Sequence, residues 1–416
     1  MRKITPEIHT GTQAANAQQI SDLSLIMPAQ SSGAILGNKD QQKMLQKRAR
    51  SKYFSMHLAQ ELAALNSNLK KSYERTYNCG SQITQTGNKL TSTYCGARWC
   101  VMCNRIRTAK LINKYTPHLN EMHQPCFITL TIPNITGTAA DLRAEVDRMQ
   151  IFLRKASDNL RKYGIKFKGF RKIEISYNYK KNNYHPHIHI LSDGTIDVSE
   201  WCDKKSIQKI WKLWKMKGFS RSRFSELIKR YNTGKITAGC FKGELLLQMW
   251  LENFPDARSV AQDVRPATPG TLKELFKYST KVLTKSKSLN KYTYTSREYV
   301  TRSGEVREVL KKSLAPAEVY CFVSSLDKIY RALKNKRVLQ PTGYCKEELQ
   351  QFNEIASGAV QDDLQAQEFN DLQQGATAYV WCGYDWREII TGAFLSGFIP
   401  DRSDQSRITS FVFDSG

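Results

Sequence analysis

The segment 184–190, with the sequence YHPHIHI, constrains the fold of this chain more than any other. Three of the seven histidines of the chain occupy every second position in it: His185, His187 and His189. Successive side chains of a β-strand point to opposite faces, so a strand here places the three imidazoles on one face and the isoleucines in the core. Two imidazoles two residues apart on one strand face can share a divalent metal ion.

A different interpretation makes the histidines satisfied polar residues of an edge strand, where Pro186 is tolerated. Three histidines on the same face of an apolar strand favour the metal site over this alternative. Imidazole alone does not select the metal, because it suits zinc, copper, iron and nickel.

Strand and helix patterns follow one another along most of the chain. Strand patterns cover residues 127–132, 170–178, 184–191 and 259–265, and helical patterns cover residues 41–72, 139–163, 199–217, 271–283 and 317–336. The order strand, helix, strand, strand, helix predicts an α+β fold with a central antiparallel β-sheet flanked by helices.

The two strands at 170–178 and 184–191 predict a β-hairpin, because only polar residues separate them. With Lys181 and Asn182 as a two-residue turn, Glu174 lies opposite His189, and directly opposed residues share a face. A slip of one residue would remove Glu174 from that face, whereas a slip of two would keep it there.

This hairpin predicts a metal site made of His187, His189 and Glu174. Two imidazoles and one carboxylate leave positions open for water and a substrate oxygen. Such a site suits Mg²⁺ or Mn²⁺ serving as a Lewis acid on a phosphate. In the alternative interpretation, Glu174 is a surface charge on an exposed sheet face.

A second cluster of metal-binding side chains precedes the first strand. It consists of Cys79, Cys95, Cys100 and Cys103, and the last two form a C-x2-C pair. Four thiolates bind Zn²⁺ tetrahedrally, and a close pair forms a knuckle. We therefore predict a structural zinc site, in which His118 or His123 is an alternative to Cys79 as the fourth ligand. Four unconnected reduced thiols are the other interpretation.

The charge of the chain favours a polyanionic partner. The formal net charge is +25 at pH 7. Residues 341–416 contain twelve acidic side chains against four Lys and Arg, so the remaining 340 residues carry about +33. We interpret this excess as a nucleic-acid footprint. Basic residues that follow the cysteines, at Arg105, Arg107 and Lys110, suit phosphates.

Long apolar segments are missing from the sequence. No run of some 18 apolar residues predicts a membrane span, so we expect no membrane partner. The N-terminal residues do not resemble a secretory signal, and ten cysteines in 416 residues are not dense enough for a disulfide scaffold. We therefore expect a cytoplasmic protein.

Three motifs together resemble the HUH endonucleases, and among these most of all the initiators (Rep proteins) of rolling-circle plasmid replication. Residues 127–131 (FITLT) resemble the first motif, His187-Ile188-His189 resembles the His–hydrophobic–His motif, and residues 277–281 (KYSTK) resemble the third. Residues 95–103 also resemble the Cys-rich stretch of plasmid initiators. The resemblance covers residues 75–345. It implies an HUH endonuclease-like fold for the central sheet, with the histidine strand in the middle of that sheet.

The resemblance implies that Tyr278 is the nucleophile. A tyrosine hydroxyl can form a 5′-phosphotyrosine bond that stores the energy for rejoining. Lys281 follows three residues later, on the same helix face, where its charge would favour the phenolate or the transition state. Glu274, one turn before Tyr278, either activates water to end the reaction or caps the helix as part of Thr271-x-x-Glu274. Both roles of Glu274 stay open.

From the resemblance we expect a replication initiator that nicks and rejoins single-stranded origin DNA with the aid of a divalent metal. Its partners would be single-stranded or hairpin plasmid origin DNA, a host helicase and a polymerase. An HUH relaxase or transposase with the same chemistry is an alternative, since Tyr53, Tyr73, Tyr77 and Tyr94 precede the histidines, as the nucleophile does in relaxases. A non-catalytic zinc-dependent nucleic-acid-binding protein is another.

The same patterns divide the chain into four expected segments. They are a flexible leader (1–45), a helical and Cys-rich zinc-binding element (46–116), an HUH catalytic nicking domain (117–340) and an acidic C-terminal segment (341–416).

Overall fold

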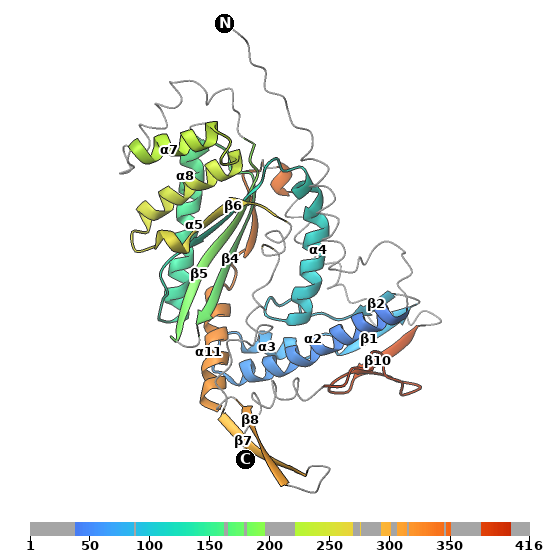
Figure 1. Cartoon of the computed structure of the whole chain (residues 1–416). Helices are drawn as coiled ribbons and strands as arrows, with labels where there is room; N and C mark the ends of the chain where they lie inside the picture. The colour runs from blue at the N-terminus through green and yellow to red at the C-terminus, as the bar shows by residue number, and fades with distance from the viewer. Residues whose placement is uncertain are drawn as a thin grey trace.

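A computed structural model describes most of the chain (Figure 1). It covers residues 38–86, 89–161, 165–178, 181–195, 221–268, 275, 293–300, 306–313, 316–344, 347–350 and 376–400. The described strands pair only in antiparallel fashion, and helices pack on them. This confirms the predicted α+β class with antiparallel sheets.

The central sheet has five strands in the order β6-β3-β5-β4-β9. Their bounds are β3 (Cys126–Thr131), β4 (Gly169–Asn178), β5 (Asn183–Ser192), β6 (Asp263–Pro266) and β9 (Leu339–Thr342). The histidine strand β5 therefore lies in the middle of the sheet, as predicted. The pairing of β3 with β5 reaches only as far as His187. Pro186 is tolerated just beyond it, because the N–H group that proline lacks would have no partner on β3.

Alternating side chains give this sheet two different faces. Isoleucines and leucines of β3, β4 and β5 face the helices α5 (Ala139–Arg161) and α8 (Ala238–Asn253) in the main core. On the other face, Phe127, Phe170 and Leu191 pack against the helix α4 (Val101–Asn120). Figure 1 shows α5 and α8 on one side of the sheet and α4 on the other.

A second sheet lies at the N-terminal side of α4 and joins distant parts of the chain. Its order is β11-β10-β1-β2, and Ile83 of β1 pairs with Tyr379 of β10. The bounds are β1 (Gln82–Thr86), β2 (Lys89–Ser92), β10 (Thr377–Trp381) and β11 (Trp386–Glu388). Part of the segment expected to be an acidic tail thus belongs to the fold around the cysteines.

Helices α2 (Asn38–Ala64) and α3 (Lys70–Tyr77) run from this second sheet toward the central sheet (Figure 1). At their far end, Ser67 Oγ and Tyr73 Oη donate hydrogen bonds to Asp327 Oδ1 at 2.5 and 2.7 Å. Asp327 belongs to α11 (Pro316–Ala332), which also packs on α5. The remaining described elements are α7 (Arg221–Asn232), a 3-10 turn η3 (Ser259–Ala261) and the hairpin of β7 (Thr293–Val300) and β8 (Val306–Ser313).

Several predicted element bounds are wrong in detail. The single helix expected at 41–72 is two helices, because Ser67 Oγ accepts the Leu69 N–H and so stabilises a turn between them. In the strand expected at 259–265, residues 259–261 form η3 and only the end is β6. The helix predicted at 199–217 lies outside the described residues.

The predicted hairpin register is also wrong by two residues. Glu174 pairs with His187, not with His189, and the last pair is Asn178 with Asn183. Four residues therefore connect the strands. Side chains favour this longer turn: Asn178 Oδ1 accepts the Lys181 N–H, and Asn182 has the positive φ of 47° that asparagine tolerates. A slip of two keeps Glu174 on the histidine face.

Within the described residues, no helix is long and apolar enough to cross a membrane.

Candidate metal centres and nucleophile

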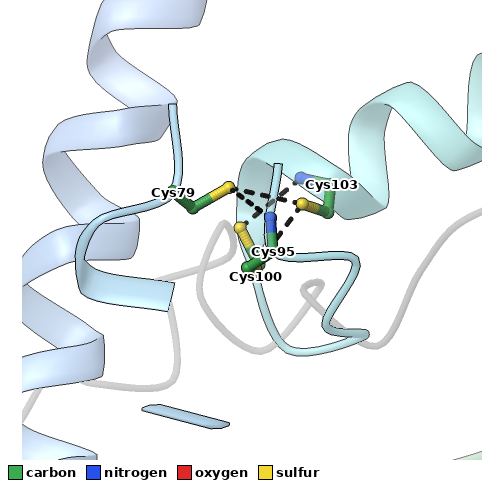
Figure 2. Close-up of side chains that lie close together, drawn as sticks. All are labelled: Cys79, Cys95, Cys100 and Cys103. Carbon is green, nitrogen blue, oxygen red and sulfur yellow. Dashed lines mark hydrogen bonds between the residues drawn. The ribbon is translucent and has the colours of Figure 1, made fainter. Parts of the chain in front are cut away.

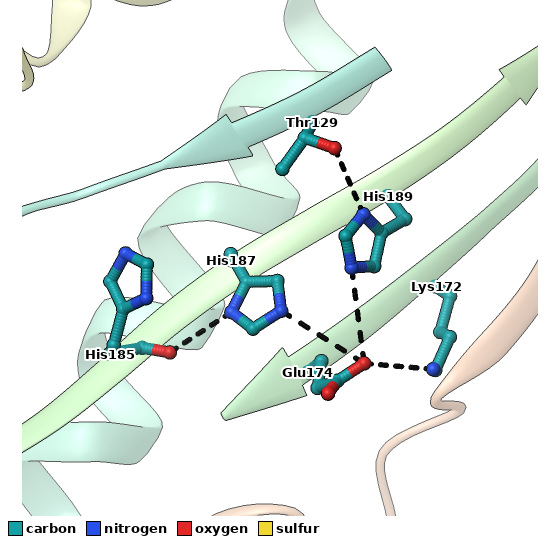
Figure 3. A network of polar contacts seen from close by, with 6 residues as sticks. All are labelled: Thr129, Lys172, Glu174, His185, His187 and His189. Carbon is teal, nitrogen blue, oxygen red and sulfur yellow. Dashed lines mark hydrogen bonds and ion pairs between the residues drawn. The ribbon is translucent and has the colours of Figure 1, made fainter. Parts of the chain in front are cut away.

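Glu174, His187 and His189 meet on the α4-facing side of the central sheet (Figure 3). The Nε2 atoms of His187 and His189 each lie 3.9 Å from Glu174 Oε2. Strand pairing produces this geometry, because Glu174 is directly opposite His187 and one diagonal step from His189. All three side chains are largely buried.

Neighbouring oxygens orient both imidazoles. The carbonyl oxygen of His185 can only accept, so it takes the Nδ1–H of His187 at 3.1 Å. Thr129 Oγ1 lies 3.1 Å from His189 Nδ1 and can accept in the same way. Each contact leaves an Nε2 lone pair facing Glu174, which is the arrangement of metal-binding histidines. His185 contributes its backbone, while its ring stacks on His187 and stays outside the three-residue group.

The donor set fits a hard or borderline divalent ion. Ligand atoms 2.0–2.2 Å from one ion lie roughly 3–4 Å apart, and the two Nε2–Oε2 distances fall in that range. Three protein ligands from one face leave the opposite side for water or substrate. The described residues therefore can hold a metal ion at the place that the sequence predicted.

Lys172 is a further charged member of this group that the sequence interpretation missed. It lies directly opposite His189, and its Nζ donates to Glu174 Oε2 at 2.8 Å. Its side chain is only 3% exposed, which is rare for lysine. Burial by itself would raise the pKa of Glu174, but the charge of Lys172, joined by the charges of the two histidines when these are protonated, outweighs it and holds that pKa below its ordinary value. The signal was available, since Lys172 precedes Glu174 by two residues and shares its face.

An aromatic wall borders the metal group on the same face of the sheet. The Phe127 ring stacks on His189 with centroids 5.3 Å apart, and Phe170 packs on Tyr115 of α4. Leu275 is 1% exposed and belongs to the same apolar cluster. It is the one described residue of the segment predicted as a helix at 271–283, and its conformation is helical. The predicted Tyr278, Glu274 and Lys281 lie outside the described residues.

The four cysteines form the second candidate centre (Figure 2). The Sγ atom of Cys103 lies 3.4 Å from that of Cys79 and 3.6 Å from that of Cys95. Four thiolates on one tetrahedral zinc ion lie about 3.8 Å apart, because each Zn–S bond is about 2.3 Å. Cys79 is the fourth member, and neither His118 nor His123 joins this group in the part of the chain that the structure describes.

Backbone N–H groups and a buried lysine surround these sulfurs. Cys100 begins α4, and its Sγ accepts the N–H of Cys103, so the positive end of the helix faces the thiolates. Ser55 of α2 donates to Cys100 Sγ at 3.4 Å. Lys52 is fully buried nearby, where its Nζ donates to Tyr77 O and Ser81 Oγ. Burial lowers the Lys52 pKa to about 8, although the nearby thiolates act in the opposite direction.

The basic residues after the cysteines have structural contacts. Arg105 donates to the carbonyl of Lys47 at 2.9 Å and to Ser51 Oγ, and Arg107 donates to the carbonyl of Gly96 at 2.6 Å. These two guanidinium groups join α4 to α2 and to the cysteine loop. A contact of these residues with phosphates stays a prediction.

Comparisons with known proteins found one family and several relatives to which the chain is similar. Residues 88–199 match the model of a family described as "Replication protein", and this range contains both metal groups except Cys79. The chain is similar to replication proteins of the Rep family. This similarity confirms the resemblance to rolling-circle plasmid initiators.

Three relatives, each named "Protein rep", illustrate the extent of the similarity. The protein of Staphylococcus aureus is 27% identical over 185 residues, which are 42% of this chain and 78% of that protein. The protein of Streptococcus pneumoniae serotype 2 is 31% identical over 156 residues, 31% of this chain and 47% of that protein. A Bacillus protein is 28% identical over 151 residues, 32% of this chain and 48% of that protein. The latter two matches thus span about half of each relative. No solved structure matches the chain significantly.

Proposed function

We propose that this protein initiates rolling-circle replication of a plasmid by nicking and rejoining single-stranded origin DNA. The observation that carries the proposal is the convergence of Glu174, His187 and His189 on one face of the central sheet, in a chain that is similar to Rep proteins. The net charge of +25 supports a DNA partner, because phosphate neutralisation supplies much of the affinity for DNA.

Glu174, His187 and His189 would hold Mg²⁺ or Mn²⁺. When bound, the ion supplies Lewis-acid polarisation of the scissile phosphate. The protein side chains position this chemistry: Thr129 and the His185 carbonyl fix the imidazole orientations, and Lys172 fixes the carboxylate. The aromatic wall around Phe127 excludes water from one side of the site.

Tyr278 is the proposed nucleophile. Leu275 supports this assignment, because it packs with Phe127 and Leu191 on the metal-binding face and precedes Tyr278 by only three residues, which is about one turn if the helix predicted at 271–283 forms. The phenolic oxygen attacks phosphorus and loses its proton, a Tyr–O–P bond forms, and the bond from phosphorus to the 3′ oxygen breaks. The released 3′ oxygen gains a proton and can prime a polymerase, while the 5′ end stays on Tyr278.

Lys281 and Glu274 complete the proposed site. Lys281 would favour the phenolate by its positive charge, and Glu274 would either activate water in the terminating step or cap the helix. The four-cysteine group would bind structural Zn²⁺ and hold α2, α3 and α4 together. A host helicase and polymerase would act after the nick.

The test uses single-stranded oligonucleotides that tile the plasmid's own origin, labelled at the 3′ end because that fragment stays attached to the protein. With Mn²⁺, the protein should cut one oligonucleotide and leave a covalent adduct, and a chelator should abolish both. Tyr278→Phe should lose the adduct. Tyr77→Phe, at an exposed tyrosine of α3, should keep it.

Other outcomes point to the alternatives. Binding without any cut product would indicate a non-catalytic nucleic-acid-binding protein. An adduct that survives in Tyr278→Phe and maps to a tyrosine before the histidines would indicate relaxase-type chemistry. The packing of two of these tyrosines weighs against them as nucleophiles, because Tyr73 is fully buried and donates to Asp327, and Tyr53 packs among Phe54, His57 and Phe398.

A further inference from the structure

The buried ion pair of Lys172 and Glu174 is unusual for a site that receives a cation. Lys172 Nζ and the two imidazole Nε2 atoms all face the same oxygen, Glu174 Oε2. An ion bound to the three ligands would lie about 2 Å from this oxygen, hence within roughly 5 Å of the ammonium group. At that separation two positive charges repel strongly in a partly desolvated site.

Lys172 changes the net charge of the metal-binding group. Without a metal, the carboxylate and the ammonium cancel, and the imidazoles are neutral ligands. With a divalent ion, the group carries a net charge of +2, whereas a site without the lysine would carry +1. The lysine thus opposes cation binding and strengthens the attraction for an anion at the open side of the site.

The burial of Lys172 is energetically unfavourable if the residue has only a structural role. Burying an ammonium group costs several kcal/mol unless it is well paired, and an apolar side chain could fill the same place in the sheet. On the side away from Glu174 and His189, its neighbours on this face, Phe170 and Leu339, are apolar. The charge rather than the volume of the side chain is therefore the property that needs an explanation.

We propose that Lys172 tunes the metal centre toward phosphate: it lowers the affinity for the divalent ion and raises the affinity for the scissile phosphodiester. Lys172 is a positioning residue that acts through Glu174 and through its charge. This inference rests on the proposed metal site. It identifies Lys172 as the residue that sets the relative affinities of this site for the divalent ion and for the phosphodiester.

The first experiment measures Mn²⁺ binding to the full-length protein by calorimetry, at pH 8 and without DNA. Lys172→Met should bind Mn²⁺ about tenfold more tightly than the unaltered chain, because the repulsion is removed. Lys172→Arg, which keeps the charge, should not. A structural role predicts the opposite sign, since Glu174 would lose its partner and bind the ion more weakly.

The second experiment measures the coupling between Lys172 and the scissile phosphate. A Tyr278→Phe background prevents cutting, and the origin oligonucleotide carries either its natural phosphate or a neutral methylphosphonate at the cut position. With Mn²⁺, the neutral linkage should weaken binding about tenfold more with Lys172 present than in Lys172→Met. Lys168→Met removes an exposed lysine just before β4 and should leave the methylphosphonate penalty unchanged.

Two results separate this inference from the proposed function. If a His187→Ala, His189→Ala double variant binds Mn²⁺ as the unaltered chain does, the proposed metal site itself is wrong. If Mn²⁺ binding is lost in that variant, but Lys172→Met binds Mn²⁺ more weakly or retains the full methylphosphonate penalty, only the role of Lys172 is overturned. Thermal unfolding of each variant checks that it folds.

Discussion

The two candidate metal centres are built in different ways, and this difference is the basis on which we propose a structural role for one and a catalytic role for the other. The cysteine group takes its four ligands from the ends of α3 and β2 and from the start of α4, so its coordination is complete within the protein. The His/Glu group offers three ligands from two neighbouring strands, so an ion held there would have coordination positions left for other ligands. Closed thiolate sites are typical of structural zinc, whereas open sites with oxygen and imidazole ligands are typical of catalysis.

The largest effect should come from breaking the closed site. Cys100→Ser should lose bound zinc and destabilise the fold by about 3–5 kcal/mol, because metal binding is folding free energy in such sites. Elemental analysis and thermal unfolding measure both effects. Cys382→Ser, at an exposed cysteine outside the group, is the control. Unchanged zinc content in Cys100→Ser would contradict the proposed site.

Breaking the open site should affect activity and leave stability nearly intact. His187→Ala should lower the nicking rate by at least about a hundredfold, since the metal would lose a ligand, while zinc content stays the same. Quantitative nicking of the origin oligonucleotide measures the rate. A loss of zinc or a large fall in melting temperature in this variant would show that the two centres are not independent.

A smaller effect is expected from the support of one ligand. Thr129→Val keeps the shape of the side chain but removes the oxygen beside His189 Nδ1. Mn²⁺ affinity should fall about 10- to 100-fold, the usual cost of removing a second partner of a metal-binding histidine. Titration calorimetry measures it, and Thr131→Val on the same strand face serves as the comparison. Equal affinity in Thr129→Val and the unaltered chain would exclude an orienting role.

The smallest effect is expected for two buried lysines, Lys242 beside the central sheet and Lys52 beside the cysteine group. Lys242 of α8 donates to the carbonyls of Lys166 and Thr195, and burial lowers its pKa to about 8. The unfolded chain keeps this lysine protonated up to about pH 10.5, so the unfolded state binds more protons between pH 8 and 10.5 and stability should rise with pH in that window.

Lys242→Met should remove about 1–2 kcal/mol of this rise. Denaturant unfolding at pH 8 and pH 10 measures the difference. Lys52→Met should show a smaller change when the cysteine site is loaded, because the thiolates favour the charged lysine. A pH dependence that is the same in Lys242→Met and the unaltered chain would contradict the assignment.

Much of the site could be predicted from sequence because β-strand periodicity is strict. Alternation alone placed His187 and His189 on one face, and it kept Glu174 there although the predicted register was wrong by two residues. The cysteine spacing predicted a shared site for the same kind of reason, since a C-x2-C pair at a helix start has few possible geometries. Both predictions depend only on the geometry of residues that are close together in the sequence.

Tertiary structure alone decided which neighbours support these groups. The partner of β1 comes from residues 377–381, almost 300 positions away, and no local pattern identifies such a pairing. The sequence also did not reveal that Lys172 is buried against Glu174, or that Arg105 and Arg107 bind carbonyls. Periodicity determines the face on which a side chain lies, because it depends only on neighbouring residues. Burial and pairing depend on what the rest of the chain brings to that face, and only the folded structure specifies this.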